Sequence, residues 1–220
     1  MKIFFVMLLF ICGHWQVQAS DALIAAAKKN DIAQVKAELD GGARVEYMNG
    51  TGFTALILAS TLGHLEVVQL LVAHGADVNA ASKNGMTAIA SAAQSRHDTA
   101  MVTQFFAQNG ASLDGEFGEW EMAPLQLAIM NHNTASALVL IDAGADLMAV
   151  DKVDDPSLHG AIYQEDEKVE RALLQNNVDL FFVNDNQKNA VQFAKKWNKS
   201  KFVLPIILEF YPDICNKTDC

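Results

Sequence analysis

A period of 33 residues runs through this chain and constrains its fold more than any other feature. With residues 54–80 as the template, Leu56 recurs in chain order as Leu23, Ile89, Leu125, Leu158 and Val191, with one spacing of 36 before Leu125. Three residues after each of these positions stands an alanine: Ala26, Ala59, Ala92, Ala128, Ala161 and Ala194. A fixed period of this length predicts a repeat array, in which each unit buries its apolar face only against its neighbours.

Each repeat is predicted to be a hairpin, a helix, a turn and a second helix. A large apolar residue and an alanine three apart share one helix face, and alanine lets a neighbouring backbone approach closely. A second apolar run follows, such as VVQLL at 67–71. Next comes a column of residue types that end helices in a left-handed conformation: Gly42, Gly75, Gly110, Gly144 and Asn177. Asn49-Gly50 and Asn84-Gly85 are expected to form tight turns at hairpin tips.

These units resemble ankyrin repeats. The family's TPLH is partly kept as TALI from Thr54, TAIA from Thr87, APLQ from Ala123 and PSLH from Pro156, and GHLEVVQLLVAHGADVNA from Gly63 is similar throughout. The resemblance covers six units, at about 20–47, 48–80, 81–114, 115–149, 150–182 and 183–210, with 211–220 as a tail. It implies an all-α solenoid with β-hairpin tips on one side, which binds other proteins through the tips and first helices and lacks catalytic activity.

Matching positions of successive units predict a protein-binding surface on the tips and inner helices. It comprises Tyr47, Phe53, Leu62, Met86, Phe117, Glu119, Trp120, Met122, Asp155, Tyr163 and Trp197. Exposed apolar and aromatic groups cost solubility, which partner binding would offset. For Phe53 and Met122, packing against the adjacent hairpin remains an alternative. The hairpin GEFGEWEMAP, at 115–124, is one residue longer than its neighbours, and Trp120 beside Phe117 and Met122 is expected to be its hot spot.

The acidic balance indicates the kind of partner. Residues 1–19 contain one charged residue, Lys2, so removing them leaves 15 basic and 26 acidic residues and a net charge of −11. Such a chain is expected to be repelled by nucleic acid and anionic membranes and to attract a protein with a basic patch. The charge could also serve solubility alone. A monomer is expected in the free state.

No residue pattern indicates catalysis, a cofactor or a metal site. His64 and His97 are one period apart and could lie side by side, but no Cys is near them and no HExxH motif is present. The resemblance to ankyrin repeats places His64 and His159 at positions where His usually makes structural hydrogen bonds. No GxSxG motif is present, and the acidic residues at 165–170 are expected to form a solvated loop leading into a helix.

The two ends of the chain indicate export. Residues 1–19 have the apolar run 3–12 and end in Val-Gln-Ala, as a cleaved signal peptide does, and the run is shorter than the roughly 20 residues of a membrane span. Cleavage would leave Cys215 and Cys220 as the two remaining cysteines. In an oxidising compartment they are expected to form a disulfide.

The signal, the size and the acidic aromatic edge together predict a periplasmic protein-binding module. Its expected role is that of an inhibitor or immunity protein, which occludes a toxic secreted enzyme such as a lipase. The alternative is a periplasmic accessory protein that supports an oxidative-stress enzyme such as catalase.

Overall fold

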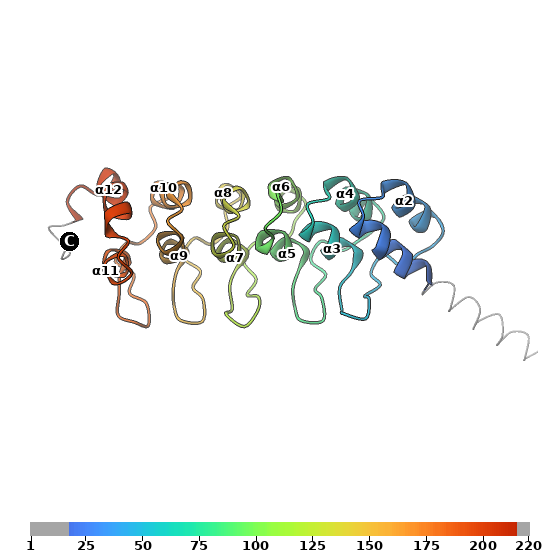
Figure 1. Ribbon diagram of the computed structural model, residues 1–220, viewed down its shortest axis with the longest axis horizontal. Helices are drawn as coiled ribbons and strands as arrows, with labels where there is room; N and C mark the ends of the chain where they lie inside the picture. Colours follow the sequence, from blue (N-terminus) through green and yellow to red (C-terminus); the bar gives the residue numbers. More distant parts are fainter. Residues whose placement is uncertain (1–17, 215–220) are drawn as a thin grey trace, which may run out of the picture.

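The computed structural model describes residues 18–214 and shows an all-α solenoid of stacked helix pairs (Figure 1). Residues 18–28 are helical and precede α2 (Ile32–Asp40). The later pairs are α3 (Ala55–Thr61) and α4 (Leu65–Ala73), α5 (Ala88–Gln94) and α6 (Ala100–Gln108), α7 (Pro124–Met130) and α8 (Thr134–Asp142), α9 (Ser157–Gln164) and α10 (Glu167–Gln175), and α11 (Ala190–Lys196) and α12 (Ser200–Phe210). Hairpins project from one side of the stack (Figure 1). The predicted fold class is confirmed.

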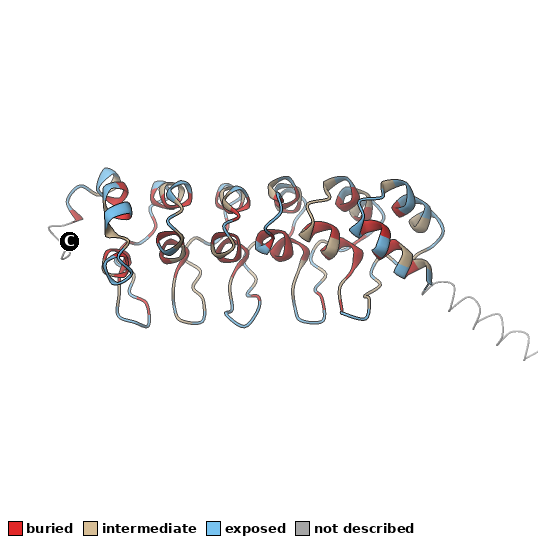
Figure 2. Cartoon of the chain, in the orientation of Figure 1, coloured by how far each residue is buried: buried red, intermediate tan, exposed pale blue. Residues whose placement is uncertain are grey.

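The repeat column forms the core between successive inner helices. Helices α3, α5, α7, α9 and α11 pack one against the next, as do the outer helices α2 to α12. All twelve residues of the apolar and alanine columns are at most 4 % exposed. In Figure 2 the buried residues lie where helices face one another. Each inner helix has only seven or eight residues, too few for a stable isolated helix, so its stability comes from stacking.

Left-handed residues end the outer helices as predicted. Gly42, Gly75, Gly110, Gly144 and Asn177 all have positive φ, between 56° and 88°. Caps also fix the starts of inner helices. The side chain of Thr54 accepts the amide of Ile57, and in unit four, where Ala123 replaces this threonine, Gln126 Oε1 accepts the amide of Ala123 instead.

The first hairpin turns one position away from the predicted Asn49-Gly50 turn. The amide of Gly52 donates to the carbonyl of Asn49, and Gly52, with φ of 87°, is the left-handed residue. The side chain of Asn49 accepts the amides of Thr51 and Phe53, which fixes this geometry. In the second hairpin the equivalent hydrogen bond runs from the amide of Gly85 to the carbonyl of Ser82, and Gly85 is likewise left-handed, with φ of 83°.

An added segment before unit four is held by a buried asparagine. Asn133 donates to the carbonyl of Ser95 at 3.1 Å and to Thr99 Oγ1 at 2.8 Å, and so ties the longer α5–α6 turn to α8. The 36-residue spacing is therefore accommodated without breaking the stack.

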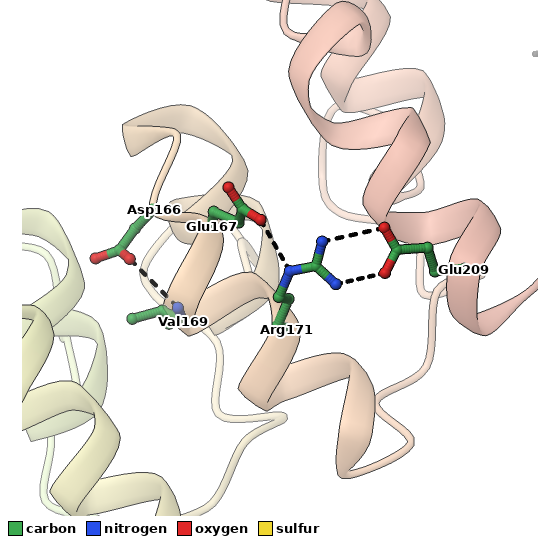
Figure 3. Close-up of polar contacts among 5 residues, drawn as sticks. All are labelled: Asp166, Glu167, Val169, Arg171 and Glu209. Carbon is green, nitrogen blue, oxygen red and sulfur yellow. Dashed lines mark hydrogen bonds and ion pairs between the residues drawn. The ribbon is translucent and has the colours of Figure 1, made fainter.

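An arginine joins the last two units on the outer layer (Figure 3). Arg171 on α10 donates to both carboxylate oxygens of Glu209 on α12, at 2.5 and 3.1 Å, and to Glu167 at 2.9 Å. The expected disulfide of Cys215 and Cys220, and most of the expected signal peptide, lie outside the described residues. Among residues 18–214, no helix has the length and apolar character of a membrane span.

Candidate functional site

A groove of about 670 Å³ lies between the hairpins and the inner helices of units three to six. Helices α7, α9 and α11 form one wall, and the hairpins at 117–122 and 151–155 form the other. Its lining includes Met86, Trp120, Met130, His159, Tyr163 and Trp197. The groove is thus built on the side from which the hairpins project.

The groove brings together most of the residues predicted to bind a partner. Met86, Phe117, Glu119, Trp120, Met122, Asp155, Tyr163 and Trp197 all line it. Tyr47, Phe53 and Leu62 lie outside it. Tyr47 and Phe53 are half-buried and pack against the core, and so do Met86 and Met122. Leu62 is the C-terminal cap of α3.

Trp120 lies at the tip of the longest hairpin. Phe117 and Met122 exchange backbone hydrogen bonds of 2.9 and 3.1 Å, which leaves four residues at the tip. In the second hairpin Ser82 pairs with Met86, and three residues lie between them. The extra residue is therefore confirmed. Trp120 is 54 % exposed, and its carbonyl accepts the amide of Lys152 from the next hairpin at 3.0 Å.

Phe117 does not share this exposure, and the expectation of two exposed aromatic rings on this hairpin is wrong. Phe117 is 8 % exposed and belongs to the core. Its ring lies over Gly115, where a Cβ would be 2.5 Å from Phe117 Cζ. Glycine at 115 thus makes room for the inward ring, and Trp120 alone presents an exposed ring at this tip.

Three aromatic rings form the helical wall of the groove. Tyr163 and Trp197 meet edge to face with centroids 5.3 Å apart, and both are more than 40 % exposed. Phe193 lies beneath them, 6.2 Å from Trp197. Lys196 Nζ lies 5.3 Å from the Trp197 ring, and Lys199 Nζ lies 5.8 Å from the Tyr163 ring.

Two buried polar residues of α9 also line the groove. Ser157 and His159 are each 1 % exposed, and neither Ser157 Oγ nor either imidazole nitrogen has a hydrogen-bond partner of good geometry among the described residues. The structural hydrogen bonds expected for His159 do not reach good geometry among the described residues, although the backbone of Lys188 and Asn189 interacts with the ring. The ring packs edge-on against Phe193 at 4.6 Å. Burial lowers the pKa of His159, against the opposing influence of Asp155 and the nearby backbone of Lys188 and Asn189.

Carboxylates dominate the hairpin side of the groove. Glu119, Asp151 and Asp155 line it, and Lys196 is the one lysine in its lining among residues 18–214. Asp155 accepts a 2.5 Å hydrogen bond from Asn184. Next to them, contact with Asp185 raises the pKa of the exposed Asp154. The hairpin side therefore has an excess of negative charge.

Sequence reasoning missed the floor of the groove. Met130, Ser157 and His159 at the floor, and Phe193 in the helical wall, were not proposed as binding residues, although His159 was identified by its motif position. The period places residues on the inner helices, but it does not show which buried polar atoms lack partners. The described residues contain no group of three or more His, Cys, Asp or Glu side chains that could hold a metal ion.

Comparisons with known proteins agree on the repeat type. A family model of ankyrin repeats, in three copies, matches residues 4–82. The chain is 37 % identical to zygote-specific protein 3 of Chlamydomonas reinhardtii over 98 residues, which cover 44 % of this chain and 26 % of that protein. It is 43 % identical to ankyrin repeat domain-containing protein 13B of Mus musculus over 56 residues, 26 % of this chain and 9 % of that protein. The chain thus spans about a quarter or less of these relatives.

A solved structure covers more of the chain. It is that of the Bd0816 predatory endopeptidase from Bdellovibrio bacteriovorus in complex with immunity protein Bd3460. One chain of it matches with a TM-score of 0.75 and 22 % identity, over 86 % of this chain and 97 % of that chain. At this identity the likeness shows the fold. The fold is therefore that of an ankyrin-repeat solenoid, all-α, and the family model itself matches residues 4–82.

Proposed function

We propose that this chain is an exported protein-binding module that inhibits an enzyme by seating part of it in the groove. The observation that carries the proposal is the set of exposed rings on both walls: Trp120 on the hairpin side, and Tyr163 and Trp197 on the helical side. Interface hot spots are rich in Trp and Tyr, and large exposed rings gathered in one hollow favour a protein partner.

The inhibitory role is supported by likeness of fold and by the shape of the site. The similar chain comes from a complex of an endopeptidase with an immunity protein. A rigid stack with a preformed groove loses little conformational entropy on binding, which suits tight occlusion of an enzyme. The expected partner is a toxic secreted enzyme, such as a lipase or a peptidase, with a basic patch.

Export belongs to the same proposal, because a secreted enzyme would be met outside the cytoplasm. Cleavage after Ala19 would make Ser20 the first residue of the mature protein. N-terminal sequencing of the protein from fractionated bacterial cells tests this. Periplasmic protein that begins at Ser20 supports export, and intact Met1 in the cytoplasmic fraction contradicts it.

Co-expression with candidate toxic enzymes in the periplasm tests inhibition. The wild-type chain should restore growth, and the purified chain should inhibit the enzyme at equimolar ratio. Trp120→Ala should weaken both effects. Met101→Ala is the matched control, because Met101 is 60 % exposed on the outer helix α6, away from the groove lining. If both variants protect equally, the groove is not the inhibitory surface.

A further inference from the structure

We propose that the groove takes an arginine side chain of the partner, held between the carboxylates of Asp151 and Asp155 and the aromatic rings of the helical wall. The inference rests on the proposed function, and it names the chemical group that the groove recognises. It stands on three observations about the groove: the charge of one wall, the unpartnered hydroxyl of the floor, and the rings of the other wall.

The charge on the hairpin side favours a cation. Asp151 and Asp155 line the groove, and Asp154 and Asp185 are in contact on the neighbouring tips. Like charges held this close repel one another, and a bound cation relieves the repulsion. Lys196 lies on the opposite wall, where its ammonium group is placed over Trp197, so it does not neutralise these carboxylates.

The floor offers a hydrogen-bonding group that the protein itself does not use. Ser157 Oγ is buried without a partner in the described part of the chain, and neither nitrogen of His159 makes a hydrogen bond of good geometry there, although the backbone of Lys188 and Asn189 interacts with its ring. Buried polar groups are normally satisfied, so the unpartnered Ser157 hydroxyl beneath the groove points to a ligand that donates a hydrogen bond to it. Burial lowers the pKa of His159 and so favours the neutral ring, which keeps one nitrogen as an acceptor for an N–H group.

The aromatic wall distinguishes arginine from lysine. A guanidinium group is planar, carries five N–H donors and stacks on aromatic faces, whereas an ammonium group is a compact and strongly hydrated charge. Phe193, Tyr163 and Trp197 line the groove opposite the carboxylates. Carboxylates on the hairpin side, rings on the helical wall and the Ser157 hydroxyl at the floor between them fit a guanidinium.

Short peptides test the proposal on the full chain. Acetyl-Gly-Arg-Gly-amide, its lysine analogue and its citrulline analogue are titrated at pH 7.5 and followed by two-dimensional NMR and Trp fluorescence. Citrulline keeps the shape of arginine and removes the charge. We expect the arginine peptide to perturb groove signals saturably and to bind about tenfold more tightly than the citrulline peptide, since a charged hydrogen bond is replaced by a neutral one. Equal binding of the two peptides, or no perturbation of groove residues, overturns the proposal.

Two variants locate the site. Ser157→Ala should weaken the arginine peptide several-fold without lowering the melting temperature, because Ser157 Oγ bonds nothing in the described residues. Asp155→Asn should weaken binding of the arginine peptide as well. Asp142→Asn, on the outer helix α8, makes the same charge change and should leave the affinity for the peptide unchanged. Unchanged binding in both groove variants places the arginine elsewhere and overturns the proposal.

The peptides and the whole partner answer different questions. A partner that fills the groove without an arginine there overturns this inference and leaves the proposed function intact. An arginine peptide that binds the groove of a chain that inhibits no enzyme supports the site and contradicts the proposed function.

Discussion

Glu170 is a buried carboxyl on α10. It is 2 % exposed, and its Oε2 has no hydrogen-bond partner in the described part of the chain. Burial, with the negative charges of Asp166, Glu167 and Glu165, raises its pKa to about 7, against the opposing effect of Arg171. In an unfolded chain the pKa of Glu is about 4.3. The folded state therefore binds this proton more tightly, and its contribution to stability falls as the pH rises from about 4 to 7.

Glu170→Gln should remove this pH dependence. The neutral amide has no charge to bury, so we expect the free energy of unfolding to rise by about 3 kcal/mol at pH 8 and to change little at pH 4. Urea denaturation at a series of pH values measures it. Glu66→Gln, at an exposed position of α4, is the control, and its free energy of unfolding should differ from that of the wild type by the same amount at every pH. If the stability of the Glu170→Gln variant falls as steeply with rising pH as that of the wild type, Glu170 does not cause the pH dependence.

The aromatic residues of the third hairpin should separate binding from stability. Trp120→Ala should cost about 2 kcal/mol or more of binding free energy and leave the melting temperature nearly unchanged, since the ring is 54 % exposed. Phe117→Ala should instead lower the free energy of unfolding by about 2 kcal/mol, because a buried ring leaves a cavity. Calorimetry and a binding assay on both variants measure the contrast. If Trp120→Ala unfolds the hairpin, its ring is core packing.

The sequence could not distinguish these two rings. Phe117 and Trp120 are three residues apart in the same polar stretch, and composition predicts exposure for both. The difference comes from the bridge between Phe117 and Met122, which sets which side chains face inward. Which residues of a hairpin pair with each other depends on the three-dimensional structure, and the sequence of this stretch does not specify it. The same holds for His159, because the geometry of its contacts with the backbone of Lys188 and Asn189 depends on the exact position of the next unit.

Among the elements, α9 contributes to two parts of the groove: Ser157, His159 and Gly160 lie at its floor, and Tyr163 lies in its helical wall. A Cβ at Gly160 would lie 3.4 Å from Ile129 Cγ2 and 3.8 Å from Met130 Sδ, which are van der Waals distances. The position therefore tolerates a methyl group, and its small residue keeps the floor open.

Gly160→Ala should stabilise the protein and weaken partner binding together. Alanine favours a helix interior over glycine by up to about 1 kcal/mol, so the melting temperature should rise. The added methyl group narrows the groove, so affinity for the inhibited enzyme should fall. Thermal unfolding and titration of the same sample measure both effects. A stabilised variant with unchanged affinity would show that the partner does not reach the floor near Gly160.

At the element scale the period predicted more than the turn motifs did. The 33-residue period predicted the helices and the buried alanines correctly, because stacking repeats the same environment in each unit. The Asn-Gly motif misplaced the first hairpin turn, although Gly52 and Gly85 are themselves one period apart and share the left-handed conformation. Equivalent positions in a repeat are thus better guides than isolated dipeptides.

Across the whole molecule, as far as residues 18–214 describe it, helices pack mainly against those of neighbouring units, so the ends of the stack differ from its middle. The groove lies in units three to six, and the Arg171 to Glu209 pair joins the last two of these on the opposite layer. Outer-layer contacts therefore help hold the groove walls of units five and six in register.

Negative charge is the other property of the whole molecule, with a net charge of −10 for the full sequence. Glu116, Glu119 and Glu121 flank Trp120 in the hairpin, and all three are exposed. Glu119 also lines the groove. Charges of this kind speed the approach of a basic partner more than they strengthen the complex. Their effect falls with salt, because the Debye length is about 10 Å at 0.1 M and about 3 Å at 1 M.

Changing these three glutamates to glutamine should therefore lower the association rate constant with the partner, with little change in the dissociation rate constant. The difference from the wild type should disappear at high salt, and stopped-flow fluorescence of Trp120 at several salt concentrations measures it. Trp120→Ala, followed by surface plasmon resonance, is the contrast: it should raise the dissociation rate constant at every salt concentration, because it removes buried contact area and no charge. If the glutamine variant instead dissociates faster at all salt concentrations, the carboxylates make direct contacts in the complex, and steering is not their role.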